Sequence, residues 1–145
     1  MKFYKVLILF FIYILSINKL YSIEPDVFVQ STVNRASKIL SEDISKKKKM
    51  EELQIIAKDT VDIVGIGFYT LGSARKNLDD NQKKKYGILF QDYFLKSFSS
   101  RLAEYTNPEI EVKEKEFLNN NYTIVRSILI ATSERPEVNI DWRVY

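Results

Sequence analysis

The side chains that could do chemistry in this chain are carboxylates, lysines, hydroxyls and aromatic rings, because its 145 residues include no cysteine and no histidine. Without cysteine there is no disulfide, thiol nucleophile, iron–sulfur cluster or thiolate zinc site. Without histidine there is no Ser-His-Asp triad and no imidazole metal ligand. These two gaps in the composition exclude most hydrolytic and redox enzymes, and we expect no cofactor and no metal.

The paired carboxylates and the paired glycines do not form a catalytic motif. Asp79-Asp80 and Glu51-Glu52 are adjacent pairs, and adjacent carboxylates at a helix start are usually caps rather than general acids and bases. Gly65 and Gly67 are not followed by the Lys-Ser/Thr pair of a phosphate-binding loop. The sequence therefore indicates a protein that is not an enzyme.

Two lysine runs, residues 46–49 and 83–85, are the most basic segments. Such runs can contact anionic lipid headgroups or nucleic acid, but acidic residues neighbour both, and we interpret them as solvated helix faces. The net charge of +3 comes from three lysines in the first 22 residues, since residues 23–145 carry 19 basic and 19 acidic side chains. A basic excess is typical of proteins that bind nucleic acid, so we predict no nucleic-acid partner.

The first 22 residues have the pattern of a secretory signal peptide. Lys2 and Lys5 form a positive n-region, residues 6–15 are an unbroken apolar run, and Leu20-Tyr21-Ser22 offers a small residue for cleavage. The run is about half of the roughly 20 residues that span a bilayer, and an uncleaved single-span anchor is the alternative. We predict export to the periplasm, removal of residues 1–22 and a single mature domain over residues 23–145.

Apolar spacing predicts three helices in the first part of the mature chain. Pro25 suits a first helical turn, and an apolar stripe follows it at helical period to Leu40. A second helix, capped by Ser45, keeps its period through Val64 and leads into an apolar patch that stops at Gly72. The third helix begins at residues 78–80 and ends at Asn107-Pro108.

After Pro108 the apolar period changes to two. Residues 109–118, 122–132 and 138–145 are predicted strands, and residues 119–121 and 133–137 are the turns between them. Helices followed by an antiparallel meander predict an α+β fold in which the helices pack on one face of an antiparallel sheet. The sequence does not decide which face of residues 122–132 points inward, since Ile124, Ile128 and Ile130 are apolar as well as Val125 and Leu129. Because a final strand at the end of the chain leaves a sheet edge unpaired, we expect either that the natural domain continues or that this gene product is shortened.

A stripe of large side chains follows the third predicted helix: Tyr86, Phe90, Phe94, Phe98, Leu102 and Tyr105. Such a stripe either packs on the strands as an ordinary core or borders a cavity for a greasy ligand. Periodicity does not separate these alternatives, and taken alone it favours the core.

The order of motifs between residues 62 and 105 adds a resemblance. Asp62 precedes an apolar helix that stops at Leu71-Gly72, and Asp80-Asn81-Gln82 opens the aromatic stripe. In this order the chain resembles the MlaC family of periplasmic toluene-tolerance or ABC-transporter auxiliary proteins. Residues 125–127 and 140–143 are similar to the family's strands. The chain departs from the family at residues 73–75, where an aromatic pair is common, at Ile128, and in lacking a further strand and a C-terminal helix.

The resemblance implies an NTF2-like carrier of phospholipid that needs no cofactor. Its partners would be a phospholipid ligand, an outer-membrane lipoprotein complex and an inner-membrane ABC transporter complex, and its role would be to maintain outer-membrane lipid asymmetry. We expect the following residues to line the acyl chains: Ile63, Phe68, Leu71, Phe90, Phe94, Phe98, Val125, Leu129, Ile140 and Trp142. The alternatives are an NTF2-like enzyme or binding module for a small apolar ligand, and a shortened remnant that transports nothing.

Overall fold

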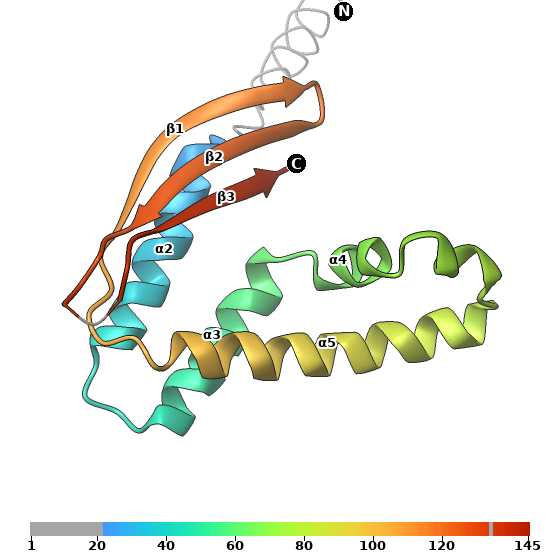
Figure 1. Cartoon of the computed structure of the whole chain (residues 1–145), viewed down its shortest axis with the longest axis horizontal. Coiled ribbons are helices and arrows are strands. Elements are labelled where there is room, and N and C mark those ends of the chain that lie inside the picture. The colour runs from blue at the N-terminus through green and yellow to red at the C-terminus, as the bar shows by residue number, and fades with distance from the viewer. Residues whose placement is uncertain (1–21, 134) are drawn as a thin grey trace, which may run out of the picture.

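The structure, a computed structural model, describes residues 22–133 and 135–145. The predicted signal peptide lies outside these residues, apart from Ser22. Helices come first and strands last (Figure 1): α2 (Pro25–Ser41), α3 (Lys46–Thr60), α4 (Ile63–Thr70), the 3₁₀-helix η1 (Gly72–Asn77), α5 (Asp80–Leu102), β1 (Ile110–Asn119), β2 (Tyr122–Leu129) and β3 (Val138–Val144). The strands form one antiparallel sheet in the order β1-β2-β3, which confirms the predicted α+β fold.

Three helices begin where the sequence predicts. Pro25 is in the first turn of α2, where its missing N–H costs nothing. The Ser45 hydroxyl accepts a hydrogen bond from the Lys48 N–H at 3.2 Å and caps α3. At α5 the Asp79 carboxylate accepts from the Gln82 N–H at 2.8 Å, and the Gln82 side chain accepts from the Asp79 N–H at 3.0 Å. This reciprocal capping box fixes the first turn of α5.

Two predicted helix boundaries are wrong. The second predicted helix is interrupted, because Val61 is extended and the Asp62 carboxylate accepts from the Gly65 N–H at 2.9 Å, which starts α4 as a separate helix. The third helix ends at Leu102, before the predicted stop at Asn107, whose φ is 48°. The aromatic stripe is therefore one turn shorter than predicted, and Tyr105 lies outside α5.

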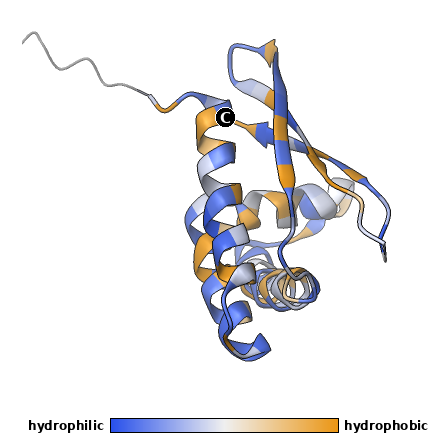
Figure 2. Cartoon of the chain, turned by 90° about the vertical axis from the view of Figure 1, so that its left-hand side faces the viewer, coloured by the Kyte–Doolittle hydropathy of each residue, from blue (hydrophilic) through white to orange (hydrophobic). Residues whose placement is uncertain are grey.

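Helix α2 covers one face of β1 and β2 (Figure 1). Val29 and Val33 of α2 pack on Val125 of β2, and these three side chains are at most 3% exposed. Thr123 and Ser127 are buried on the same face, so the inward face of β2 carries Val125 and not Ile124 or Ile128. Figure 2 shows the resulting alternation of hydrophobic and hydrophilic residues along the strands.

Strand β1 contains one more residue than its partner over a short stretch. Val112 pairs with Ser127 and Lys115 pairs with Val125, so three steps along β1 match two along β2. Such a bulge bends the strand and increases its twist. It also places Val112 and Lys115 on the same side, where Val112 packs on the α2 core and Lys115 reaches the start of α2.

Helices α4 and α5 and the η1 turn between them form a helical arm, residues 63–102, that runs along the longest axis away from the sheet (Figure 1). The buried cluster of the arm consists of Ile63 of α4, Leu95 of α5 and Ala57 of the neighbouring helix α3. Gly67 lies against the Phe90 ring, which an added Cβ would meet at 2.8 Å. Within the described part of the chain, no helix has both the length and the apolar character that a membrane span requires.

Candidate functional site

Four aromatic rings form a stacked ladder along α5. Neighbouring ring centroids of Tyr86, Phe90, Phe94 and Phe98 are separated by 5.8, 6.2 and 5.4 Å. Spacing of four residues places them on one helix face. The three phenylalanines pack against the cluster of Ala57, Ile63 and Leu95, yet each keeps part of its surface exposed. The ladder is therefore an apolar surface that the rest of the arm covers only in part.

The four sheet residues predicted for the site share one face of the sheet. Val125 pairs with Trp142, and Ile140 and Leu129 are on the same side at the neighbouring inward positions. The Trp142 indole N–H donates to the Ser127 hydroxyl at 2.8 Å, which orients the indole. Val125 is 0% exposed beneath α2, whereas Leu129, Ile140 and Trp142 are partly buried. A ligand could reach Val125 only if α2 moved.

The ladder and the sheet face belong to different hydrophobic clusters. Trp142 packs on the Val29–Val33–Val125 cluster, and the phenylalanines pack on the helical one. Among the described residues α2 makes the extensive helix–sheet contact, and α4 and α5 meet the sheet at isolated points at most. The structure thus presents two apolar surfaces that do not interlock.

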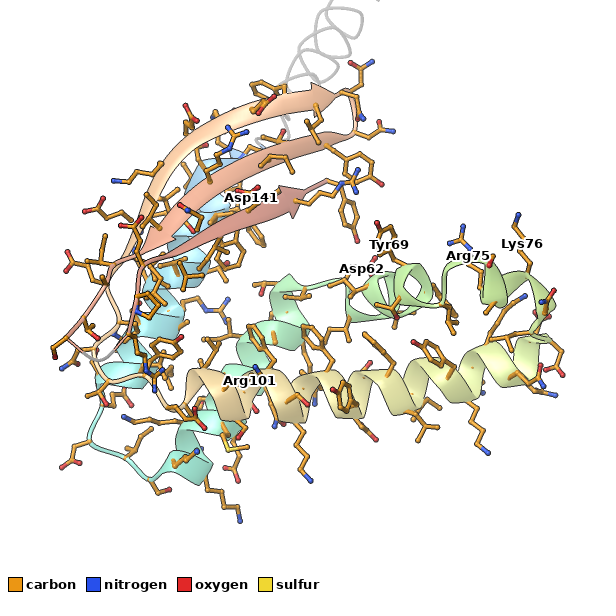
Figure 3. All side chains as sticks on the ribbon, in the orientation of Figure 1. Asp62, Tyr69, Arg75, Lys76, Arg101 and Asp141 are labelled. Carbon is orange, nitrogen blue, oxygen red and sulfur yellow. The ribbon has the colours of Figure 1, made fainter. Side chains whose placement is uncertain are left out.

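One polar contact links the end of the sheet to the arm. The pKa of the Tyr145 phenol is raised, and the largest cause is hydrogen bonding with the Asp62 carboxylate. Asp62 caps α4, and Tyr145 lies edge-on to Tyr122 with 6.0 Å between ring centroids. Asp62 points out from the start of α4 on the side of β3 (Figure 3).

The other two predicted residues lie farther along the arm. Phe68 is in α4 and Leu71 is its C-cap residue, and both are partly buried. Phe68 lines an open pocket of about 390 Å³ together with Arg75, Lys76 and Lys83. The ten predicted residues are therefore divided between six on the arm and four on the sheet, and their role in lining a ligand stays a prediction.

Sequence reasoning missed the basic residues beside Phe68. Arg75 and Lys76 are in η1, for which no role was predicted, and Lys83 belongs to a run interpreted as a solvated face. A signal was present in the Leu71-Gly72 stop, because Gly72 has φ 54° and separates α4 from η1. The chain then reverses between η1 and α5 (Figure 1), which brings residues 75 and 76 next to the first turns of α5.

Comparisons with known proteins show which fold and which family this chain resembles. No curated protein matches the chain. A solved phospholipid-binding protein from Ralstonia solanacearum, crystallised in complex with a phospholipid, is similar to the chain with a TM-score of 0.67 and 12% identity, over 83% of this chain and 70% of that one. At that identity the likeness shows the fold. The family model described as "MlaC protein" matches residues 30–145, which is most of the chain, and the chain therefore belongs to the MlaC family.

Proposed function

We propose that this chain binds a phospholipid and carries it through the periplasm between an outer-membrane lipoprotein complex and an inner-membrane ABC transporter. The observation that carries the proposal is the pair of partly exposed apolar surfaces, the ladder of α5 and the inward face of β3, which do not pack on each other. Membership of the MlaC family supports it, as does the phospholipid bound to the solved protein of similar fold.

The physical basis is the hydrophobic effect. Two acyl chains hold about 30 methylenes, and at about 0.8 kcal/mol each their exposure to water costs on the order of 25 kcal/mol. Apolar walls remove most of this cost, as a bilayer does, so exchange between membrane and carrier is nearly balanced. The carrier therefore lowers the barrier to transfer, and its partners set the direction. Binding of this kind needs neither a cofactor nor a covalent step.

Phospholipid binding is tested by native mass spectrometry of protein purified gently from the periplasm. The wild-type chain should carry phospholipid. Phe94→Asp places a charge within the ladder and should abolish most of the bound lipid, whereas Tyr93→Asp, at a neighbouring side chain that is 69% exposed, should retain it. Ile140→Asp tests the sheet side independently if Phe94→Asp does not fold. A lipid-free wild-type spectrum, or equal loss in Tyr93→Asp, would contradict the proposal.

The carrier role is tested by photo-crosslinking in cells. A photoreactive residue at the exposed position 66 of α4 should capture a subunit of an inner-membrane ABC transporter and, in separate adducts, an outer-membrane lipoprotein. Capture of neither would leave lipid binding standing and contradict the shuttle role.

A further inference from the structure

The far end of the arm concentrates positive charge. This arm tip, residues 72–85, contains Arg75 and Lys76 in η1 and Lys83, Lys84 and Lys85 in α5, against the carboxylates of Asp79 and Asp80. The tip therefore carries a formal charge of +3, although residues 23–145 as a whole are neutral. Arg75 and Lys76 project from the end of the arm (Figure 3).

Most of these cations lack a carboxylate partner. Elsewhere some basic side chains are engaged by two carboxylates each, as Arg126 is by Glu114 and Glu116 and Lys115 is by Glu24 and Asp26. At the tip Lys83 is 3.6 Å from Asp80, and the other four basic side chains form no ion pair with any described residue. Unpaired cations that gather at one end of a neutral molecule are available to an external anion.

Three of the cations and one aromatic ring line the same pocket. Arg75, Lys76, Lys83 and Phe68 surround about 390 Å³ of open space, which is within the roughly 300–1,000 Å³ of ligand pockets. The Phe68 ring and the carbon stems of the three basic side chains form an almost entirely apolar wall, which suits the carbon atoms of a lipid headgroup. The guanidinium and the two ammonium groups of these side chains are available to the oxygens of its phosphate.

The apolar side chains near the tip favour a membrane surface over an acidic protein. Tyr69 is 79% exposed and projects from α4, between Asp62 and Arg75 (Figure 3), and Ile88 and Leu89, one turn beyond the lysine run, are 57% and 58% exposed. Basic groups attract anionic headgroups while aromatic and aliphatic side chains enter the interfacial region. Exposed apolar side chains next to unpaired cations are the combination that an interfacial binding site uses.

We propose that the arm tip docks directly on an anionic bilayer and that its basic side chains bind the phosphate of a lipid headgroup. This docking site is separate from the apolar surfaces assigned to the carried lipid. It brings the arm, with its aromatic ladder, to the membrane from which a lipid is taken or to which it is delivered. The site would act even if the chain retained no lipid of its own.

Vesicle co-sedimentation tests the proposal. Wild-type protein should bind vesicles of phosphatidylcholine and phosphatidylglycerol, bind pure phosphatidylcholine weakly, and lose binding as salt rises. Arg75→Gln with Lys76→Gln should weaken binding about 25-fold, since each basic group near the surface contributes about fivefold. Lys46→Gln with Lys47→Gln removes the same charge from the start of α3 and should have little effect.

Three results would overturn the proposal. If wild-type protein does not bind anionic vesicles, the tip would be assigned to an acidic protein partner instead. Equal weakening by the two double variants would show attraction by net charge alone. Complete displacement from the vesicles by millimolar glycerol phosphate would assign the pocket to a free phosphate ester, whereas a tip anchored also by its apolar side chains should stay bound. All four substituted side chains are exposed, so folding should be unchanged, and native mass spectrometry of lipid retention reports on the carrier role separately.

Discussion

Several charges in the half of the molecule formed by α2 and the sheet are paired between elements, whereas four of the five cations at the end of the helical arm form no ion pair with a described residue. Lys115 of β1 donates to Glu24 and Asp26 at the start of α2, at 2.7 Å in both cases. Apolar exposure does not separate the halves in the same way, since the first exposes Val27 and Phe117 and the arm exposes Ile88, Leu89 and Tyr93. The halves therefore differ in how their charges are paired and not in apolar exposure.

The largest contrast should come from one substitution made in each half. Val125→Asp puts an unpaired carboxylate at a site with 0% exposure and should cost more than about 4 kcal/mol, which prevents folding. Val64→Asp, at a side chain 44% exposed in the first turn of α4, should change stability by less than about 0.5 kcal/mol. Urea denaturation measures both. A similar loss in the two variants would remove the distinction between the halves.

Within the arm, the contact of α4 with α5 depends on Gly67. Gly67→Ala brings a methyl group to 2.8 Å from the Phe90 ring and should destabilise the protein by about 1–3 kcal/mol, because overpacking displaces the ring. Thermal unfolding should show a lower midpoint, and near-ultraviolet circular dichroism should show a changed aromatic signal. An unchanged spectrum would mean that the ladder does not depend on this contact.

In the sheet half, the hydrogen bond from Trp142 to Ser127 should contribute less than the core. Trp142→Phe leaves the Ser127 hydroxyl, in a side chain 1% exposed, without its 2.8 Å donor, at a cost of about 1–2 kcal/mol. Ser127→Ala combined with Trp142→Phe should recover part of the loss. Additive losses in the double variant would contradict the coupling.

Helix α5 offers a matched control for Gly67. An added Cβ at Gly87 meets nothing within 4 Å, so Gly87→Ala should stabilise the protein by about 0.5–1 kcal/mol through the lower entropy of the unfolded chain. The same substitution is thus expected to have opposite signs at two positions of the arm. Destabilisation by Gly87→Ala would indicate a partner on that side of the helix.

The ion pairs of Lys115 should give a small pH dependence. Its hydrogen bond lowers the pKa of Asp26 below the ordinary 3.8, so this contribution to stability is present above pH 3.8 and is lost as pH falls through the folded-state pKa. Hydrogen bonds to Asp26 and then Glu24 raise the pKa of Lys115 above 10.5, and that contribution is lost only as pH rises past it. Lys115→Met should therefore reduce stability at neutral pH and make little difference well below pH 3.8. An equal effect at both pH values would contradict this pairing.

Local signals in the sequence predicted the starts of helices and the alternating strands well. Pro25, Ser45 and Asp79 act within one turn of their own position, so the sequence alone identifies them. The apolar period missed the break at Asp62 because Ile63 and Val64 continue it across the break, whereas the order of motifs did place an apolar helix after Asp62. The Asp62 cap starts a new helix through a side-chain hydrogen bond, and the spacing of apolar residues contains no information about such a bond.

The candidate site was harder to predict because it depends on which surfaces face each other. Periodicity placed Phe90, Phe94 and Phe98 on one face of α5, but it did not show that they pack on Ile63 while Val125 packs on α2. The convergence of Arg75 and Lys83 depends on the chain reversal between η1 and α5. Such pairings belong to the tertiary structure, and no single segment contains them.

The extra residue in β1 has a consequence for the shape of the whole sheet. The bulge that bends the sheet lies in β1, the most hydrophilic strand, between Val112 and Lys115, and not among the core residues. Deleting one residue there would leave Val112 and Lys115 two residues apart and still on the same face, and would restore regular pairing at that step and straighten the strand. The bend of the sheet over α2 could thus be lost without any change in hydrophobic content, through a single change in strand length.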